Sequence, residues 1–244
     1  MNTNSQQNTS PPAQQPAGKF ITVRGKRLHY HDQGQGEPLL LLQGGGPGAN
    51  GWSNYQRNIG PLSRRFRVIT PDLPGFGQSQ PPDRPEKLFG LYAQTMLELL
   101  EALQLPSASV VGNSLGGGTA IKMALLAPQA VNRLILMGPA GLEPAWTPMP
   151  TEGIRRLMSY YAGEGPSREK LRSFLEIMIY NSSELTDAML DTRYQASIAP
   201  DILANPPVGR SGKPPIEALG QEDLAAITQD RKSTRLNSSH PYRS

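Results

Sequence analysis

The sequence contains no cysteine, which excludes disulfide bridges and thiolate metal ligands. It has no run approaching about 18 consecutive apolar residues, so we expect no transmembrane helix. Residues 1–18 have neither the apolar core nor the basic start of a secretory signal, and their polar composition predicts a disordered tail. These absences favour a cytoplasmic protein.

Acidic residues are absent from residues 231–244, which hold four of the 24 Lys and Arg residues and none of the 20 acidic residues. The net charge of +4 therefore belongs to this tail, and the rest of the chain is balanced. A balanced surface has no field that attracts nucleic acid or membrane, so we expect neither as a partner.

Apolar, strand-like runs alternate with helical patterns between residues 39 and 137. We predict strands at 39–42, 66–70, 109–113 and 133–137, and helices at 91–105 and 115–126, after an N-terminal hairpin around Gly25. This alternation predicts an α/β fold, with a mostly parallel sheet and helices on both of its faces.

The strand pattern stops after residue 138, where helical stretches follow at 149–162, 167–180 and 184–197. We predict a helical lid after the sixth strand. The expected organisation is a core at 19–142, a lid at 143–210, a return to the core at 211–230 and a tail at 231–244.

The segment 112–116 reads G-x-S-x-G between a predicted strand and a predicted helix. There, Ser114 would occupy a sharp, strained turn that lifts its hydroxyl clear of the sheet. Side chains at Gly112 and Gly116 would collide with the turn. The Leu115 amide would stay free at a helix N-terminus, where it can stabilise an oxyanion. The alternative is a glycine-rich turn with an incidental serine.

A second glycine-rich segment, 44–48, directly follows the predicted strand 39–42. Glycines such as Gly44 let the backbone approach a bound substrate closely. The alternative is a phosphate-binding turn, which is disfavoured because no Gly-Lys-Ser/Thr follows.

Four segments together resemble the meta-cleavage product hydrolases: GGGPGANGWSNYQRNIGPL (44–62), PDLPGFGQS (71–79), VVGNSLGGGTAIKMAL (110–125) and NRLILMGPAGL (132–142). Members of this α/β-hydrolase family cleave a carbon–carbon bond in 2-hydroxy-6-oxo-dienoates from aromatic ring degradation. The resemblance implies a small dienoate substrate and no metal or organic cofactor. It also allows a homo-oligomer, because family members commonly associate.

The resemblance makes Ser114 the nucleophile and the amides of Gly45 and Leu115 the oxyanion hole. It places Asn54 and Asn113 near the dienoate end of the substrate. The alternatives are a helix cap for Asn54 and a simple turn residue for Asn113.

In the predicted lid, Arg193 matches an arginine that binds the substrate carboxylate, and Met178 would line the apolar side of the pocket. The alternative for Arg193 is a solvated helix residue. Gln43 departs from the family, which usually has histidine at this position, and this departure puts the support of the loop in doubt.

A serine nucleophile needs a base and an orienting acid, which follow the serine in the order Asp, His in this fold. The one histidine after Ser114 is His240, in the tail. His29 and His31 lie upstream on one face of a strand, and we interpret them as structural or exposed.

We therefore expect the chain to lack the catalytic acid, the catalytic histidine and the last two strands of the fold. It would then be inactive, and the edge of the strand at 133–137 would be open. The rival interpretations are a carboxylesterase on the same scaffold and a non-catalytic binder.

The tail RKSTRLNSSHPYRS has no apolar periodicity, so it is either a disordered terminus or, as we favour, translated adapter or read-through sequence. Sequencing a fresh amplicon of the source DNA past the Asp230 codon tests this. We expect the natural reading frame to depart from KSTRLNSSH, and continuous coding for those residues would contradict the interpretation.

Overall fold

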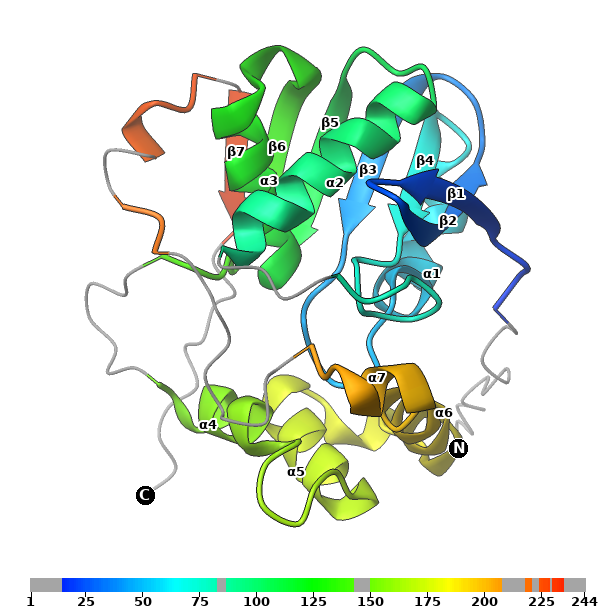
Figure 1. Ribbon diagram of the computed structural model, residues 1–244, viewed down its shortest axis with the longest axis vertical. Helices are drawn as coiled ribbons and strands as arrows, with labels where there is room; N and C mark the ends of the chain where they lie inside the picture. Colours follow the sequence, from blue (N-terminus) through cyan, green and yellow to red (C-terminus); the bar gives the residue numbers. More distant parts are fainter. Residues whose placement is uncertain are drawn as a thin grey trace, which may run out of the picture.

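A seven-stranded sheet with the order β1-β2-β4-β3-β5-β6-β7 forms the centre of the computed structural model (Figure 1). The structure describes residues 15–82, 87–142, 150–207, 218–220, 224–228 and 230–234. The strands are β1 (Lys19–Val23), β2 (Lys26–Gln33), β3 (Glu37–Leu42), β4 (Phe66–Pro71), β5 (Ala108–Asn113), β6 (Val131–Met137) and β7 (Asp230–Thr234). β1, β2 and β4 pair antiparallel and the other pairs are parallel, so the predicted sheet is confirmed.

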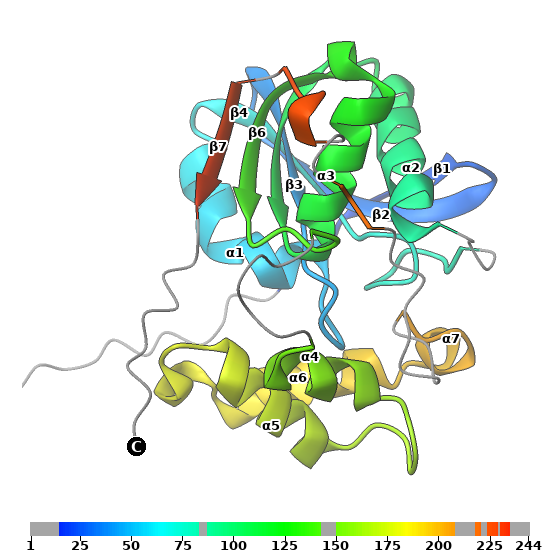
Figure 2. The same cartoon turned by 90° about the vertical axis from the view of Figure 1, so that its left-hand side faces the viewer.

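Helices cover both faces of the sheet, as the alternation predicts. Figure 2 shows α1 (Gly51–Leu62) on one face, and α2 (Leu88–Ala102) and α3 (Leu115–Leu126) on the other. Strand β3 is apolar throughout 39–42 because alternate residues enter different cores. Leu40 and Leu42 join the cluster under α2 and α3, whereas Leu39 and Leu41 join the cluster under α1.

A separate helical layer lies beyond the carboxyl ends of the parallel strands (Figures 1 and 2). It contains α4 (Glu152–Ser159), α5 (Arg168–Met178), α6 (Asp187–Ser197) and α7 (Pro200–Ala204). Short 3-10 turns are η1 (Pro128–Ala130), which precedes β6, and η2 (Ser182–Glu184), which precedes α6. No helix in the described ranges is both long enough and apolar enough to cross a bilayer.

Each of the three longer helices of this layer begins at a polar cap. The side chains of Thr151, Ser167 and Thr186 accept backbone N–H groups in the first turns of α4, α5 and α6. The layer also buries its own apolar cluster, which includes Tyr160, Leu171, Phe174, Leu175 and Leu190. The predicted helical stretches are therefore confirmed as helices with a core distinct from that of the sheet.

The edge of β6 is occupied, which corrects our expectation that it would be open. β7 pairs in parallel along β6, from Arg133 opposite Asp230 to Met137 opposite Thr234. An open edge offers a row of N–H and C=O groups that any extended segment can satisfy, whatever its side chains. One strand therefore occupies the position beside β6 that we expected to be vacant. Residues 235–244, including His240, lie outside the described residues, as do residues 1–14 of the predicted tail.

His29 and His31 are both buried, so the structural interpretation of this pair is confirmed. The Nδ1 atom of His29 lies 2.8 Å from an Asp72 carboxylate oxygen, and the Gly51 amide of α1 donates to the other oxygen at 2.8 Å. The His31 ring packs beside Trp52, and burial together with the nearby His29 lowers the pKa of His31. Asp72 therefore joins β2 to the N-terminus of α1.

Replacement of Asp72 by alanine would leave His29 and the Gly51 amide without their shared partner. Removing one member of a buried pair costs about 3–5 kcal/mol, so we expect Asp72→Ala to lower the free energy of unfolding by about 3 kcal/mol or more. Urea denaturation measures the change. Glu98→Ala is the control, because it breaks an exposed pair with Arg24 and should cost less than about 1 kcal/mol. Equal losses in the two variants would contradict the structural role of Asp72.

Candidate active site

Ser114 occupies the turn between β5 and α3 in a strained conformation. Its φ of 50° and ψ of −110° lie in a region that residues with side chains rarely adopt. The Ser114 amide donates to the Met137 carbonyl at 2.9 Å, and the Ser114 carbonyl accepts from the Ala140 amide at 2.8 Å. The loops after β5 and β6 therefore hold the turn in the geometry that the G-x-S-x-G motif predicts.

The two glycines of the motif are required because a side chain at either position would clash with neighbouring backbone. A Cβ atom at Gly112 would lie 2.5 Å from the Gly116 carbonyl oxygen. A Cβ atom at Gly116 would lie 2.3 Å from the carbonyl oxygen of Leu42, the last residue of β3. Both distances are far shorter than a van der Waals contact, so a side chain at Gly112 would distort the elbow and one at Gly116 would push it away from β3.

The loop that follows β3 lies directly beside the serine. A Cβ atom built on Gly44 would be 3.6 Å from the Ser114 Cβ, and one built on Gly45 would be 2.9 Å from Leu115 Cδ2. The Gly116 amide donates to the Gln43 carbonyl at 2.9 Å, which connects the loop to the first turn of α3. The two glycine-rich segments of the sequence are therefore brought into contact.

Two backbone amides remain available beside Ser114. The Gly44 amide is engaged, because it donates to Asn54 Oδ1 at 3.1 Å. The amides of Gly45 and Leu115 donate to no residue in the described ranges. This leaves both amides able to stabilise negative charge on a reacting oxygen.

Asn54 and Asn113 meet behind the loop. Asn54 Oδ1 accepts from the Gly44 amide and also from Asn113 Nδ2 at 3.5 Å, while Asn54 Nδ2 donates to the Asn50 carbonyl at 3.3 Å. The helix-cap alternative for Asn54 is wrong, because Asn50 is the N-cap of α1. Asn50 and Ser53 form a capping box, a signal already readable in the sequence. Contact of Asn54 and Asn113 with substrate stays a prediction.

Gln43 takes part in loop support although it departs from the family pattern. Its buried side chain donates from Nε2 to the Ala49 carbonyl at 3.3 Å. Tyr55 of α1, which the sequence analysis did not single out, donates its hydroxyl to the Leu42 carbonyl at 2.8 Å. Burial raises the pKa of Tyr55, so it stays a neutral donor.

Arg193 reaches the loop from α6. Its Nε donates to the Pro47 carbonyl at 2.8 Å, and no carboxylate in the described part of the chain forms an ion pair with it. Because Arg193 is half-buried and bonded to the loop, it is not a solvated helix residue. Loss of hydration lowers the pKa of Arg193 to about 10, which leaves the guanidinium charged at neutral pH.

Met178 lies at the C-terminal end of α5 and is 56% exposed. Its sulfur atom would be 3.1 Å from a Cβ atom built on Gly153 in α4. The place of Met178 in a substrate pocket beside Ser114 stays a prediction.

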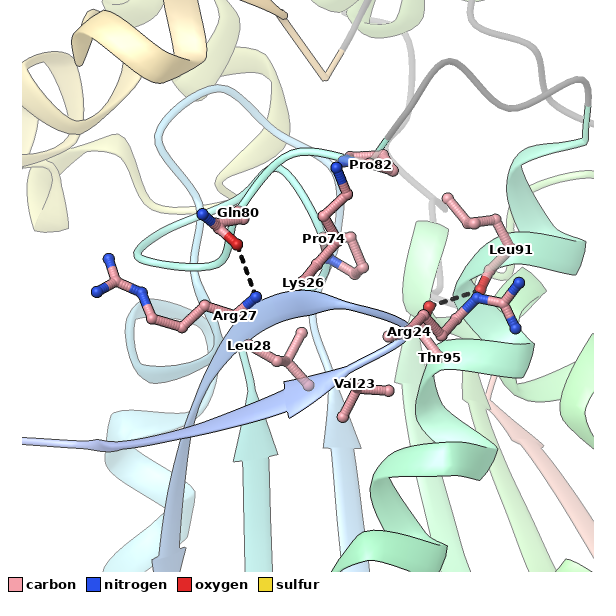
Figure 3. A pocket seen from close by; sticks show the side chains of 10 residues that line it. All are labelled: Val23, Arg24, Lys26, Arg27, Leu28, Pro74, Gln80, Pro82, Leu91 and Thr95. Carbon is pink, nitrogen blue, oxygen red and sulfur yellow. Dashed lines mark hydrogen bonds between the residues drawn. The ribbon is translucent and has the colours of Figure 1, made fainter.

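A surface pocket of about 150 Å³ lies between the β1–β2 hairpin and α2 (Figure 3). Within it, the Arg27 amide donates to Gln80 Oε1 at 2.7 Å, and the Thr95 hydroxyl donates to the Leu91 carbonyl at 2.8 Å. Its lining includes neither the elbow nor the loop after β3. The pocket is therefore separate from the candidate site around Ser114.

A strained serine at a strand-to-helix turn, facing a glycine loop after a neighbouring strand, agrees with the family comparison. The model of the alpha/beta hydrolase fold family matches residues 38–168. The chain belongs to this family.

Two similar proteins within this fold family are hydrolases of the same name. The 2-hydroxy-6-oxo-6-phenylhexa-2,4-dienoate hydrolase of Burkholderia cepacia is 43% identical over 183 residues, covering 72% of this chain and 63% of that protein. The hydrolase of the same name from Comamonas testosteroni is 42% identical over 185 residues, covering 73% of this chain and 64% of that protein. This α/β-hydrolase chain thus spans slightly less than two thirds of the length of these curated relatives.

Solved structures agree with the sequence relatives. An alanine variant of the meta-cleavage product hydrolase from Pseudomonas fluorescens IP01, complexed with acetates, has a TM-score of 0.76 and 32% identity, covering 89% of this chain and 79% of that one. A serine hydrolase from the polyaromatic hydrocarbon-degrading bacterium Cycloclasticus zankles has a TM-score of 0.79 and 25% identity, covering 90% and 80%. The resemblance to the meta-cleavage product hydrolases is confirmed.

Substitution of Gly116 by alanine tests the contact between the elbow and β3. The new Cβ would meet the Leu42 carbonyl, a backbone atom that cannot rotate away, so we expect a loss of about 1–3 kcal/mol in the free energy of unfolding. Gly60→Ala in α1 is the control, because nothing lies within 4 Å of the added Cβ. Its effect should stay below about 1 kcal/mol in the same urea titration. A Gly116→Ala protein as stable as the wild type would refute the proposed close approach.

Proposed function

We propose that this α/β-hydrolase is serine-dependent and cleaves a carbon–carbon bond in a ring-fission product of aromatic degradation, a 2-hydroxy-6-oxo-dienoate. One observation carries the proposal. Ser114 is held at a φ of 50°, beside a glycine loop, with the Gly45 and Leu115 amides left unengaged by the described residues. The names of the relatives support the substrate class.

The reaction would proceed through an acyl-enzyme. The dienol first tautomerises to a ketone. A general base from outside the described residues takes the Ser114 proton while the Ser114 oxygen attacks the distal carbonyl carbon, and that proton later goes to the dienolate. The Gly45 and Leu115 amides stabilise the oxyanion that forms. The carbon–carbon bond then breaks and expels a dienolate, and water hydrolyses the ester to release an acid. The residues named here need no metal or organic cofactor for these steps.

Arg193 supports a substrate with a carboxylate. Its Nε is engaged with the Pro47 carbonyl, whereas its two terminal nitrogens form no ion pair with the described residues. A partly desolvated guanidinium without a counter-ion attracts an anion strongly, and its planar fork suits a carboxylate. Arg193 would therefore hold the carboxylate end of the dienoate, with the lid helices around it.

We also propose that the 244-residue chain is inactive by itself. His29 is buried against Asp72, His31 packs beside Trp52, and neither ring forms a hydrogen bond with Ser114 in the described part of the chain. Loss of a triad member typically lowers the rate by about 10⁴–10⁶-fold. Without a base, Ser114 would stay protonated and the chain could only bind its ligand.

Complementation with the C-terminal segment of a curated relative tests the function. We expect the chain alone to turn over 2-hydroxy-6-oxo-6-phenylhexa-2,4-dienoate no faster than its Ser114→Ala variant. Adding the segment should restore dienoate cleavage, followed by absorbance, with Ser114 intact but not with Ser114→Ala. Enzymatic turnover by the chain alone would contradict its inactivity.

Ester hydrolysis provides the second arm of this experiment, because the same elbow serves carboxylesterases. The complemented protein is compared on a p-nitrophenyl ester and on the dienoate. Restored ester turnover without any dienoate cleavage would make the protein a carboxylesterase. If neither activity returns although the two pieces associate, a non-catalytic binder is favoured.

A further inference from the structure

The loop beside Ser114 is held from two sides by different parts of the chain. On one side, Asn54 of α1 accepts the Gly44 amide. On the other side, Arg193 of α6 donates to the Pro47 carbonyl. Gly45, which carries one of the two candidate oxyanion amides, lies between these attachments. Its position therefore depends on the core through Asn54 and on the helical layer through Arg193.

We propose that Arg193 is a positioning residue for this loop, in addition to binding a substrate carboxylate. The proposal rests on the proposed function only in assigning the Gly45 amide to an oxyanion hole. Through Arg193, docking of α6 would set the position of that amide.

Close contacts between the loop and Arg193 support the positioning role. A Cβ atom on Gly46 would lie 2.6 Å from Arg193 Nη2, and one on Gly48 would lie 2.0 Å from the Arg193 carbonyl oxygen. Gly48 also has a φ of 65°, and the Ala49 amide donates to the Gly46 carbonyl at 3.0 Å to close the turn. Glycine is therefore required at 48, by its positive φ and by the Arg193 carbonyl, whereas a side chain at 46 would displace the Arg193 guanidinium.

The same guanidinium can serve the loop and a substrate together. Its Nε is directed to the Pro47 carbonyl, and Nη1 forms no hydrogen bond with the described residues. An anion bound at the terminal nitrogens would hold Arg193 in place, and Arg193 would in turn hold the loop. Substrate binding and formation of the oxyanion hole would then be coupled, and such coupling is reciprocal.

Hydrogen exchange followed by mass spectrometry of the 244-residue chain tests the attachment without requiring turnover. We expect Arg193→Ala to speed exchange of the Ala49 amide, which donates to the Gly46 carbonyl at 3.0 Å, by about 10-fold or more, because the loop can then open without breaking the contact between Arg193 and the Pro47 carbonyl. Peptides from β5 and α2 should be unchanged. Arg193→Lys should recover part of the protection, because its ammonium can still donate to the Pro47 carbonyl.

Arg172→Ala is the matched control from the same helical layer. Arg172 is exposed and pairs with Asp187 rather than with the loop, so its loss should leave exchange at 45–49 unchanged. Loop exchange in Arg193→Ala within about twofold of this control would overturn the proposal. So would equal exchange in the alanine and lysine variants.

Gly48→Ala keeps the proposal testable if Arg193→Ala fails to fold. The added Cβ would push the Arg193 carbonyl away, so exchange in the α6 peptides should speed up while Arg193 itself is retained. Unchanged α6 exchange would overturn the proposal. None of these experiments measures turnover. A negative result would therefore overturn the positioning role of Arg193 without contradicting serine hydrolysis, and a failure of serine hydrolysis would leave the positioning role intact.

Discussion

The close approach of the elbow to the end of β3 is the constraint on which the site depends. Gly116 lies against the Leu42 carbonyl and its amide donates to the Gln43 carbonyl, so the first turn of α3 and the loop after β3 are one packed unit. Parallel pairing of β3 with β5 places the two strand ends side by side. Ser114 and the Gly45 amide are neighbours for that reason, although about 70 residues separate them in the sequence.

A buried polar network behind α1 extends this unit into the rest of the core. Asp72 accepts from the Gly51 amide at the start of α1, and Asn54, one turn later, accepts from the Gly44 amide. These hydrogen bonds favour one arrangement over its competitors, because each lost bond would leave a group desolvated. The network explains how a glycine loop with little intrinsic stiffness keeps a defined position.

Segments far along the chain contact the sheet domain in two different ways, one through the helical layer and one at the edge of the sheet. The layer buries its own core and reaches the site through Arg193, which donates to the Pro47 carbonyl and lies against Gly48. β7 instead is placed by its backbone pairing with β6. The first attachment is tied to particular residues, whereas the second is available to any extended segment.

By itself, the sequence determined the alternating α/β architecture, the helical character of the region after β6 and the elbow at Ser114. These features arise from local periodicity and from steric limits on a single turn. A short stretch of sequence contains all the residues that decide them. Tertiary structure alone decided that Arg193 contacts the loop and that β7 covers β6. Each of these depends on which distant surfaces meet, and a contact between residues about a hundred or more positions apart has no local signature in the chain.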